Sequence, residues 1–149
     1  MIIRKIRMIN FRVFRDKTID FNDKSVVLLS AANGVGKTTV VDAIEWCLTG
    51  SIGRLKIAFD TRSTNDVERK MNNGGILKNC DAGKEKKVRV FLWLVDDEGE
   101  KILCREQASD ELDPKESKVT INNDEKAAKE FIQKYVGDSL WTIWRKSRD

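Results

Sequence analysis

The sequence predicts an α/β fold, and three observations support this prediction. Residues 2–9 alternate between two faces, a glycine-rich loop separates an aliphatic run from a helical pattern, and residues 88–95 and 100–105 alternate again. Alternation with a period of two is typical of strands, and apolar residues at i, i+3, i+4 and i+7 indicate a helix. A chain of 149 residues has room for one domain at most.

Three strands are expected before the glycine-rich loop. Residues 2–9 form a strand near a sheet edge, and residues 18–21 form a second, shorter strand. The run Val26-Val27-Leu28-Leu29 is continuously aliphatic, as in strands that are buried on both faces of a sheet. We therefore expect residues 26–29 to form a central strand.

A helix is expected directly after the loop, because apolar residues recur there at helical spacing. Gly50 stands where a helix commonly ends on a glycine in the left-handed conformation. The apolar stripe of this helix consists of Val40, Ala43, Ile44, Cys47 and Leu48.

The rest of the chain predicts a hairpin and a second helix. Residues 51–87 are rich in Asn, Gly, Lys and Asp, so we expect loops and one short helix there. Residues 88–95 and 100–105 flank the polar segment Asp96-Asp97-Glu98-Gly99, which is typical of a turn. We interpret its carboxylates as turn residues and not as a metal or acid/base site.

Residues 119–121 form a further short strand, and a helix follows it. Asn123 or Asp124 can cap the start of that helix, and Gly137 ends it. Its apolar stripe consists of Ala128, Phe131, Ile132 and Tyr135.

Composition excludes several classes of protein. The hydrophobic fraction of 40% argues against wholesale disorder, and the apolar runs fall far short of the roughly 20 residues that cross a bilayer. No secretory signal is recognisable at the N-terminus, so we expect a cytoplasmic protein. The net charge of +4 permits nucleic acid as a partner, although a mixed-charge surface is the simpler interpretation.

The segment Asn33-Gly34-Val35-Gly36-Lys37-Thr38 has the spacing of a phosphate-binding loop. Its glycines allow several backbone N–H groups to point at one anion, and the helix N-terminus adds partial positive charge. Lys37 would reach the β- and γ-phosphates, and the Thr38 hydroxyl is placed to ligate Mg²⁺. A strand before the loop and a helix after it favour phosphate binding over a glycine-rich turn without a ligand.

The loop departs from the usual pattern at one position. Ala31 stands where G-x-x-x-x-G-K-[ST] has its first glycine. Alanine disfavours positive φ, so the entry to the loop and its affinity for a nucleotide can differ.

The wider pattern is more specific than the loop, which by itself does not distinguish ATPases, GTPases and kinases. Asn10-Phe11-Arg12-Val13-Phe14 follows the first strand, and Asp42-Ala43-Ile44-Glu45-Trp46-Cys47-Leu48-Thr49-Gly50 follows the loop. With these segments, residues 1–50 closely resemble the N-terminal head segment of the SMC, SbcC and RecF type of ATP-binding-cassette ATPases. Residues 88–137 are similar to the antiparallel subdomain and following helix of SbcC-like heads.

This resemblance implies a P-loop NTPase fold, namely the N-terminal lobe of an ABC-type head with an antiparallel β-subdomain. Residues 1–149 would be one partial head lobe. Its parts would be a P-loop core at 1–50, a loop-rich insert at 51–87, the β-subdomain at 88–121, and a helix and tail at 122–149.

The resemblance also implies ligands and partners. The head would bind Mg-ATP and dimerise head to head around two nucleotides in DNA repair, chromosome maintenance or anti-phage defence. DNA, a C-terminal half of the head and a nuclease are the implied partners. Arg54 or Arg62 could lie near the γ-phosphate, although solvated loop arginines are the simpler interpretation. The implied nucleotide-binding residues are Asn33, Gly34, Val35, Gly36, Lys37, Thr38, Thr39 and Arg12, with Thr38 also holding magnesium.

Several parts of such a head are missing from the 149 residues. Residues 144–149 contain no glutamine that could touch magnesium, and no Ser-Gly-Gly segment is present. The apolar strand ending in Asp-Glu that such a head needs is also not identified, because we interpret the acidic residues after 88–95 as a turn. Phosphoryl transfer needs positioned water and charge stabilisation beyond the phosphate cradle. We expect no catalytic residue in this segment and hydrolysis only with a C-terminal half; the alternative is an inactive, nucleotide-gated interaction module.

Tryptophans and basic residues outside the loop could contact nucleic acid. Trp46, Trp93, Trp141 and Trp144 could stack on bases, but packing in the core is the favoured interpretation. The basic residues at 84–89 could contact a DNA backbone, with a solvated strand end as the default.

Overall fold

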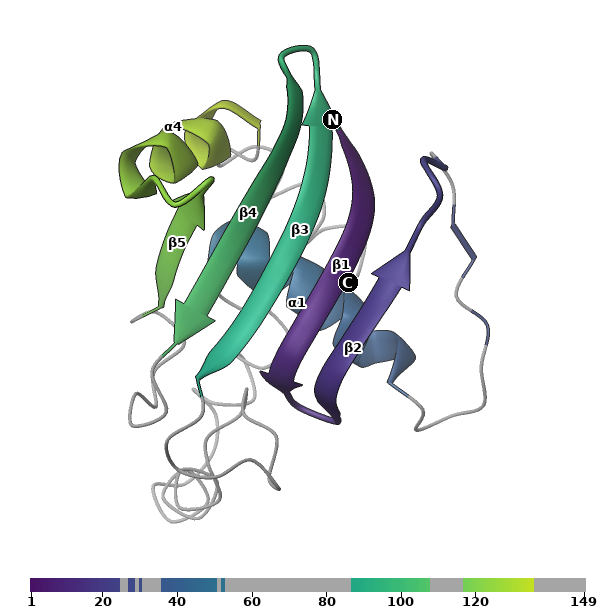
Figure 1. The fold of residues 1–149 in the computed structure, drawn as a ribbon. Helices are drawn as coiled ribbons and strands as arrows, with labels where there is room; N and C mark the ends of the chain where they lie inside the picture. Colours follow the sequence, from purple (N-terminus) through teal and green to yellow (C-terminus); the bar gives the residue numbers. More distant parts are fainter. Residues whose placement is uncertain are drawn as a thin grey trace.

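The computed structural model describes residues 1–24, 27, 28, 30, 36–50, 52, 87–107 and 117–135. Their order along the chain is β1 (Ile2–Phe11), β2 (Phe14–Asp20), α1 (Lys37–Thr49), β3 (Val88–Asp96), β4 (Gly99–Gln107), β5 (Lys118–Ile121) and α4 (Glu125–Tyr135). The strands form one sheet in the order β2-β1-β3-β4-β5, and every neighbouring pair is antiparallel (Figure 1).

The pairing of β1 with β3 joins the N-terminal strands and the strands that begin at Val88 in one sheet. Ile6 lies opposite Leu92, and Leu92 lies opposite Leu103 of β4. The strands of residues 1–50 and those of residues 88–121 therefore share a single hydrogen-bonded sheet. Strand β1 stands next to the edge strand β2, as expected for residues 2–9.

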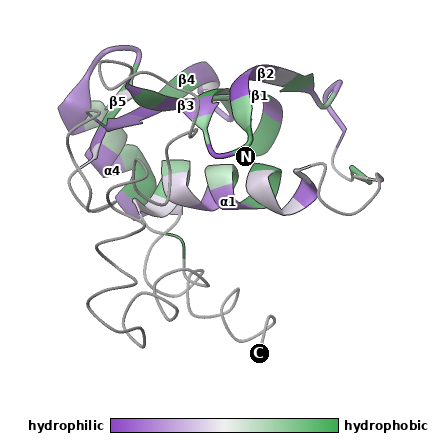
Figure 2. Ribbon diagram, turned by 90° about the horizontal axis from the view of Figure 1, so that it is seen from below, coloured by the Kyte–Doolittle hydropathy of each residue, from purple (hydrophilic) through white to green (hydrophobic). Residues whose placement is uncertain are grey.

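The core lies between one face of this sheet and α1, which runs beneath the strands (Figure 2). Alternating residues of the strands point to this face, because side chains along a strand alternate sides. Burying each large apolar side chain stabilises the fold by about 1.5–3 kcal/mol. The buried side chains include Ile6, Met8, Val90, Leu92, Leu94 and Leu103 from the sheet and Val40, Ala43, Trp46 and Cys47 from α1.

Glycines stand at both ends of α1, and the prediction of a helix ending at Gly50 is confirmed. Gly36 precedes the helix with φ 106°, and Gly50 follows it with φ 76°. The Gly50 N–H donates to the Trp46 carbonyl at 2.8 Å. Arg105 of β4 also lies at this end, where its Nε donates to the Cys47 carbonyl at 3.0 Å.

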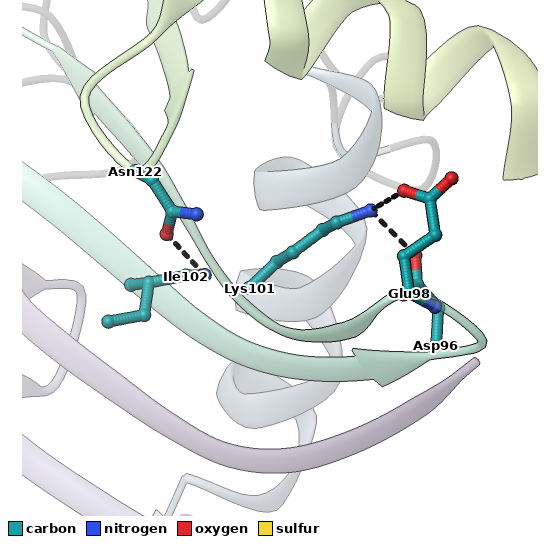
Figure 3. A network of polar contacts seen from close by, with 5 residues as sticks. All are labelled: Asp96, Glu98, Lys101, Ile102 and Asn122. Carbon is teal, nitrogen blue, oxygen red and sulfur yellow. Dashed lines mark hydrogen bonds and ion pairs between the residues drawn. The ribbon is translucent and has the colours of Figure 1, made fainter.

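The predicted hairpin is confirmed as β3 and β4, and the acidic segment forms its turn. Lys101 Nζ lies 2.9 Å from Asp96 Oδ2 and 2.8 Å from Glu98 Oε2 (Figure 3). Gly99 closes the turn with φ 112°. The ion pairs with Lys101 explain why the carboxylates of Asp96 and Glu98 gather at this turn.

The second predicted helix is confirmed as α4, and Asp124 is its cap. Asp124 Oδ1 accepts a hydrogen bond from the Ala127 N–H at 3.1 Å. Ala128 and Phe131 are buried, so the expected stripe faces the core. On the preceding turn, Asn122 Oδ1 accepts from the Ile102 N–H at 3.2 Å (Figure 3).

The prediction of a buried central strand at residues 26–29 is wrong for the two of them that the structure describes. Val27 and Leu28 adopt no strand conformation, and their exposed fractions are 44% and 89%. A strand buried on both faces needs cover on each face, and the described strands pair with one another in the order β2-β1-β3-β4-β5 without residues 27 and 28. The run is aliphatic, but its hydrophobicity alone does not determine whether other elements cover it.

Other strands differ from expectation only in length. The second strand extends over Phe14–Asp20, and β4 extends over Gly99–Gln107. Gly137, Trp141, Trp144, Ala31 and the insert at 53–86 lie outside the described residues. Among the helices that the structure does describe, none has the length and apolar character to span a membrane.

Candidate functional site

The candidate site lies where the glycine-rich loop enters α1. The structure describes Gly36, Lys37, Thr38 and Thr39 of the predicted motif, while Asn33, Gly34 and Val35 lie outside the described residues. Gly36 is the N-terminal cap of α1, and its carbonyl accepts the first intrahelical bond from the Val40 N–H at 3.1 Å. The Gly-Lys-Thr-Thr segment therefore forms the junction and first turn of a helix.

Only glycine fits at position 36. Its φ of 106° is strained for residues with a side chain. A Cβ built there would lie 2.6 Å from Phe14 Cζ and 3.1 Å from Val13 Cγ2. The turn between β1 and β2 consequently packs directly against the start of α1.

The first turn of α1 suits an anion. In an α-helix the first backbone N–H groups have no acceptor within the helix, and the helix dipole adds partial positive charge there. The first turn contains Lys37 and no acidic residue. Thr38 is exposed whereas Thr39 is buried, so the Thr38 hydroxyl is the one that can reach a ligand.

Arg12 reaches this region from the turn between β1 and β2. Its Nη1 lies 3.5 Å from Asp42 Oδ2 on α1. The Asp42 side chain is completely buried, and that of Arg12 is 26% exposed. Arg12 also has the left-handed φ of 51°, so the pair combines a buried carboxylate with a cation that remains accessible from solvent.

Two neighbours fix the backbone that presents Arg12. Asn10, with φ 52°, donates from Nδ2 to the Lys87 carbonyl at 3.2 Å. Phe11 is fully buried, and its ring centroid lies 5.7 Å from that of Trp46 on α1. The segment Asn10-Phe11-Arg12 thus docks on the start of β3 and on α1 at once.

Asp42 is the site residue that sequence reasoning missed. It belongs to the segment that carried the family resemblance, but no role was expected for it. The available signal was helical spacing, since Asp42 lies four residues after Thr38 and four before Trp46 and so shares one side of α1 with them. The arginine that faces it comes from a distant part of the chain.

The described residues fit a phosphate-bearing ligand with a hard cation. The first helical turn lacks carboxylates that would repel an anion, and Thr38 offers an exposed hydroxyl. Mg²⁺ prefers oxygen ligands and keeps several of its waters, so one protein hydroxyl beside phosphate oxygens suits it.

Comparison with known proteins agrees with this geometry. A family model described as AAA domain matches residues 5–145. Because the match covers most of the chain, the chain belongs to this family. The α/β architecture and the family match together fit a P-loop NTPase-like fold.

Two curated relatives are similar to part of the chain. It is 37% identical over 78 residues to the DNA double-strand break repair Rad50 ATPase of Thermoplasma acidophilum, which covers 50% of this chain and 9% of that protein. It is 43% identical over 47 residues to uncharacterized protein 050L of Invertebrate iridescent virus 6, which covers 32% of this chain and 4% of that protein. The matches thus span a small fraction of each relative.

The family match and the Rad50 match confirm the resemblance to the N-terminal segment of SMC- and SbcC-type ATPases.

Proposed function

We propose that this chain is the ATP-binding N-terminal segment of an SMC/Rad50-type ATPase head that acts on DNA. The observation that carries the proposal is the junction at Gly36, where a left-handed glycine leads into a helix that begins with Lys37 and Thr38. Such a junction presents backbone N–H groups, a helix dipole and a lysine to the same anion. Membership of the AAA domain family supports a nucleotide as that anion.

Each site residue has a proposed role. Residues 33–39 cradle the phosphates, Lys37 neutralises the β- and γ-phosphates, and Thr38 supplies an oxygen to Mg²⁺. Arg12 contributes a second positive charge from the turn between β1 and β2. The bound metal would supply charge neutralisation of the phosphate oxygens.

The proposed partners follow from the relatives. One relative is named a DNA double-strand break repair ATPase, which supports DNA as the polymer on which the complete assembly acts. We further propose that the head pairs with a C-terminal half and dimerises around nucleotide, and that a nuclease can join that assembly.

Binding and hydrolysis are expected to separate in this chain. The sequence has no Ser-Gly-Gly segment, the acidic residues that follow β3 form a hairpin turn, and hydrolysis requires groups that position water. The 149-residue chain should therefore bind Mg-ATP and hydrolyse it slowly. Stimulation of hydrolysis by an added C-terminal half would distinguish an ATPase head from an inactive nucleotide-gated module.

Calorimetric titration of Mg-ATP and Mg-GTP into the purified chain tests the proposal. Micromolar binding of ATP that is lost in Lys37→Ala is the expected result, because the lysine charge contacts the phosphates. Lys101→Ala is a matched control, since it removes a lysine from the hairpin turn far from the helix junction. Equal affinity of the unchanged chain and Lys37→Ala would contradict the proposed site.

Light scattering during the same titration tests dimerisation. An increase in mass that depends on ATP supports a head-to-head dimer of this chain. A constant mass with ATP bound would mean that this segment alone does not form the dimer.

A further inference from the structure

We propose that Asp42 is a positioning residue, which holds the Arg12 guanidinium near the start of α1 so that Arg12 adds positive charge to the bound triphosphate. The inference rests on the proposed function, because it concerns the same nucleotide site. It assigns a role to a buried carboxylate that neither the loop motif nor the family match explains.

The turn between β1 and β2 runs along α1 toward its N-terminal end. Phe11 packs on Trp46, Arg12 contacts Asp42, and Val13 and Phe14 lie against Gly36. Asp42 comes one turn before Trp46 and six residues after Gly36, which is about 9 Å along the helix axis at 1.5 Å per residue. An arginine side chain held at Asp42 therefore lies within reach of the helix junction.

The two members of the Arg12–Asp42 ion pair differ in exposure. An ion pair taken out of water contributes little to stability, because desolvation offsets the attraction, and apolar residues of similar size often stabilise a fold as well. The Asp42 side chain has no exposed surface, whereas Arg12 keeps 26% of its own. The exposed member of the pair is thus the cation, which is the member that can meet an anionic ligand.

Two cations belong to this end of the helix. Arg12 comes from the turn that packs on the N-terminal end of α1, where the helix dipole is positive, and Lys37 stands in the first turn, which contains no acidic residue. A triphosphate at the junction would complement both charges.

The experiment is a double-mutant cycle on nucleotide affinity with the 149-residue chain. Calorimetry gives the affinity for Mg-ATP of the unchanged chain, Asp42→Asn, Arg12→Ala and the double variant. Each single variant should weaken binding about tenfold, the size of one charge-assisted hydrogen bond. The double variant should bind no more weakly than Arg12→Ala alone, because Asp42 acts through Arg12.

A second arginine–aspartate pair provides the matched control. Arg7 donates to Asp16 at 3.0 Å and 2.7 Å on the edge of the sheet, and both side chains are about half exposed. Asp16→Asn breaks this pair and should leave nucleotide affinity unchanged. Thermal unfolding of every variant separates a loss of affinity from a loss of fold.

Three outcomes would overturn the inference. Asp42→Asn could remain folded and bind Mg-ATP as tightly as the unchanged chain, or the two single effects could simply add. If Asp42→Asn unfolds, Arg12→Lys and Arg12→Ala decide instead, because both retain the buried carboxylate and Lys keeps the charge without the planar guanidinium. Arg12→Ala binding as tightly as the unchanged chain would then overturn the inference, and intermediate affinity of Arg12→Lys would support it.

The same affinities distinguish failure of the proposed function from failure of the role of Asp42. If the unchanged chain bound Mg-ATP no better than Lys37→Ala, the nucleotide site itself would be wrong, and the role of Asp42 would fall with it. Tight, Lys37-dependent binding that is indifferent to Asp42 would overturn this inference alone.

Discussion

A few residues determine the conformation at the start of α1. Gly36 combines a positive φ with a contact that leaves no room for a Cβ atom, since Phe14 and Val13 lie against it. Arg12, the residue before Val13 in this turn, contacts Asp42 of α1. The same few residues therefore determine the conformation of the helix junction and the charge around it.

Gly36→Ala should destabilise the chain and weaken nucleotide binding. The left-handed backbone costs about 1–3 kcal/mol for a residue with a side chain, and the new methyl would press against Phe14 Cζ. Urea unfolding and calorimetry with Mg-ATP measure the two effects. Gly99→Ala is the matched control, since Gly99 also has positive φ but an added Cβ meets nothing within 4 Å. Equal losses of ATP affinity in the two variants would contradict the steric argument.

The turn between β3 and β4 should make the fold sensitive to acid. Hydrogen bonds from Lys101 lower the pKa of Asp96 and of Glu98 below their ordinary values of 3.8 and 4.5. A carboxyl with a lowered folded-state pKa contributes stability above its unfolded-state pKa, and that contribution is lost as pH falls through the folded-state pKa. Urea midpoints measured between about pH 5 and pH 2 should fall. Lys101→Met should show a shallower fall, and an unchanged slope would refute this origin.

At the scale of elements, both ends of α1 are fastened to the sheet. The turn between β1 and β2 packs on its N-terminal end, and Arg105 of β4 binds its C-terminal end. Arg105 Nη1 also donates to Ser117 Oγ at 3.0 Å, and burial lowers the pKa of its guanidinium. A cation at the C-terminal end of a helix complements the helix dipole.

Arg105→Met should loosen the C-terminal end of α1. Truncation of the donor leaves the Cys47 carbonyl without this hydrogen bond in a buried place, which costs about 1–3 kcal/mol of unfolding free energy. Chemical denaturation measures the loss. Arg7→Met is the control, because it removes an exposed arginine from the same sheet, and its denaturation curve should stay close to that of the unchanged chain. A similar loss in both variants would show that the contact with α1 contributes nothing specific.

Across the whole molecule, local signals in the sequence predicted elements better than contacts between them. Features that depend on residues close together in sequence were predicted, and these predictions are confirmed. They are the hairpin of β3 and β4, the helix α4 with its Asp124 cap, and the end of α1 at Gly50. The prediction of a buried strand at 26–29 was wrong for residues 27 and 28, because burial depends on neighbouring elements that a short segment does not specify. Asp42 and Arg105 went unassigned for the same reason, since their partners are distant in sequence.

The shared sheet predicts that the described elements unfold together. Leu92 lies fully buried in β3, between Ile6 of β1 and Leu103 of β4. Leu92→Ala should cost about 2–5 kcal/mol, and circular dichroism and tryptophan fluorescence should report one coincident transition. Ile102→Ala, on the opposite face and 37% exposed, should cost much less. Separate transitions for β1 and for the β3–β4 hairpin would contradict a single core.

The central claim is that the start of α1 and the turn between β1 and β2 form the nucleotide site. Amide hydrogen exchange with and without Mg-ATP tests it most directly, because protection reports where a ligand acts. Peptides that cover residues 10–14 and 36–42 should gain protection, and those that cover β5 and α4 should not change. Protection centred on β5 and α4, with none at the junction, would contradict the claim.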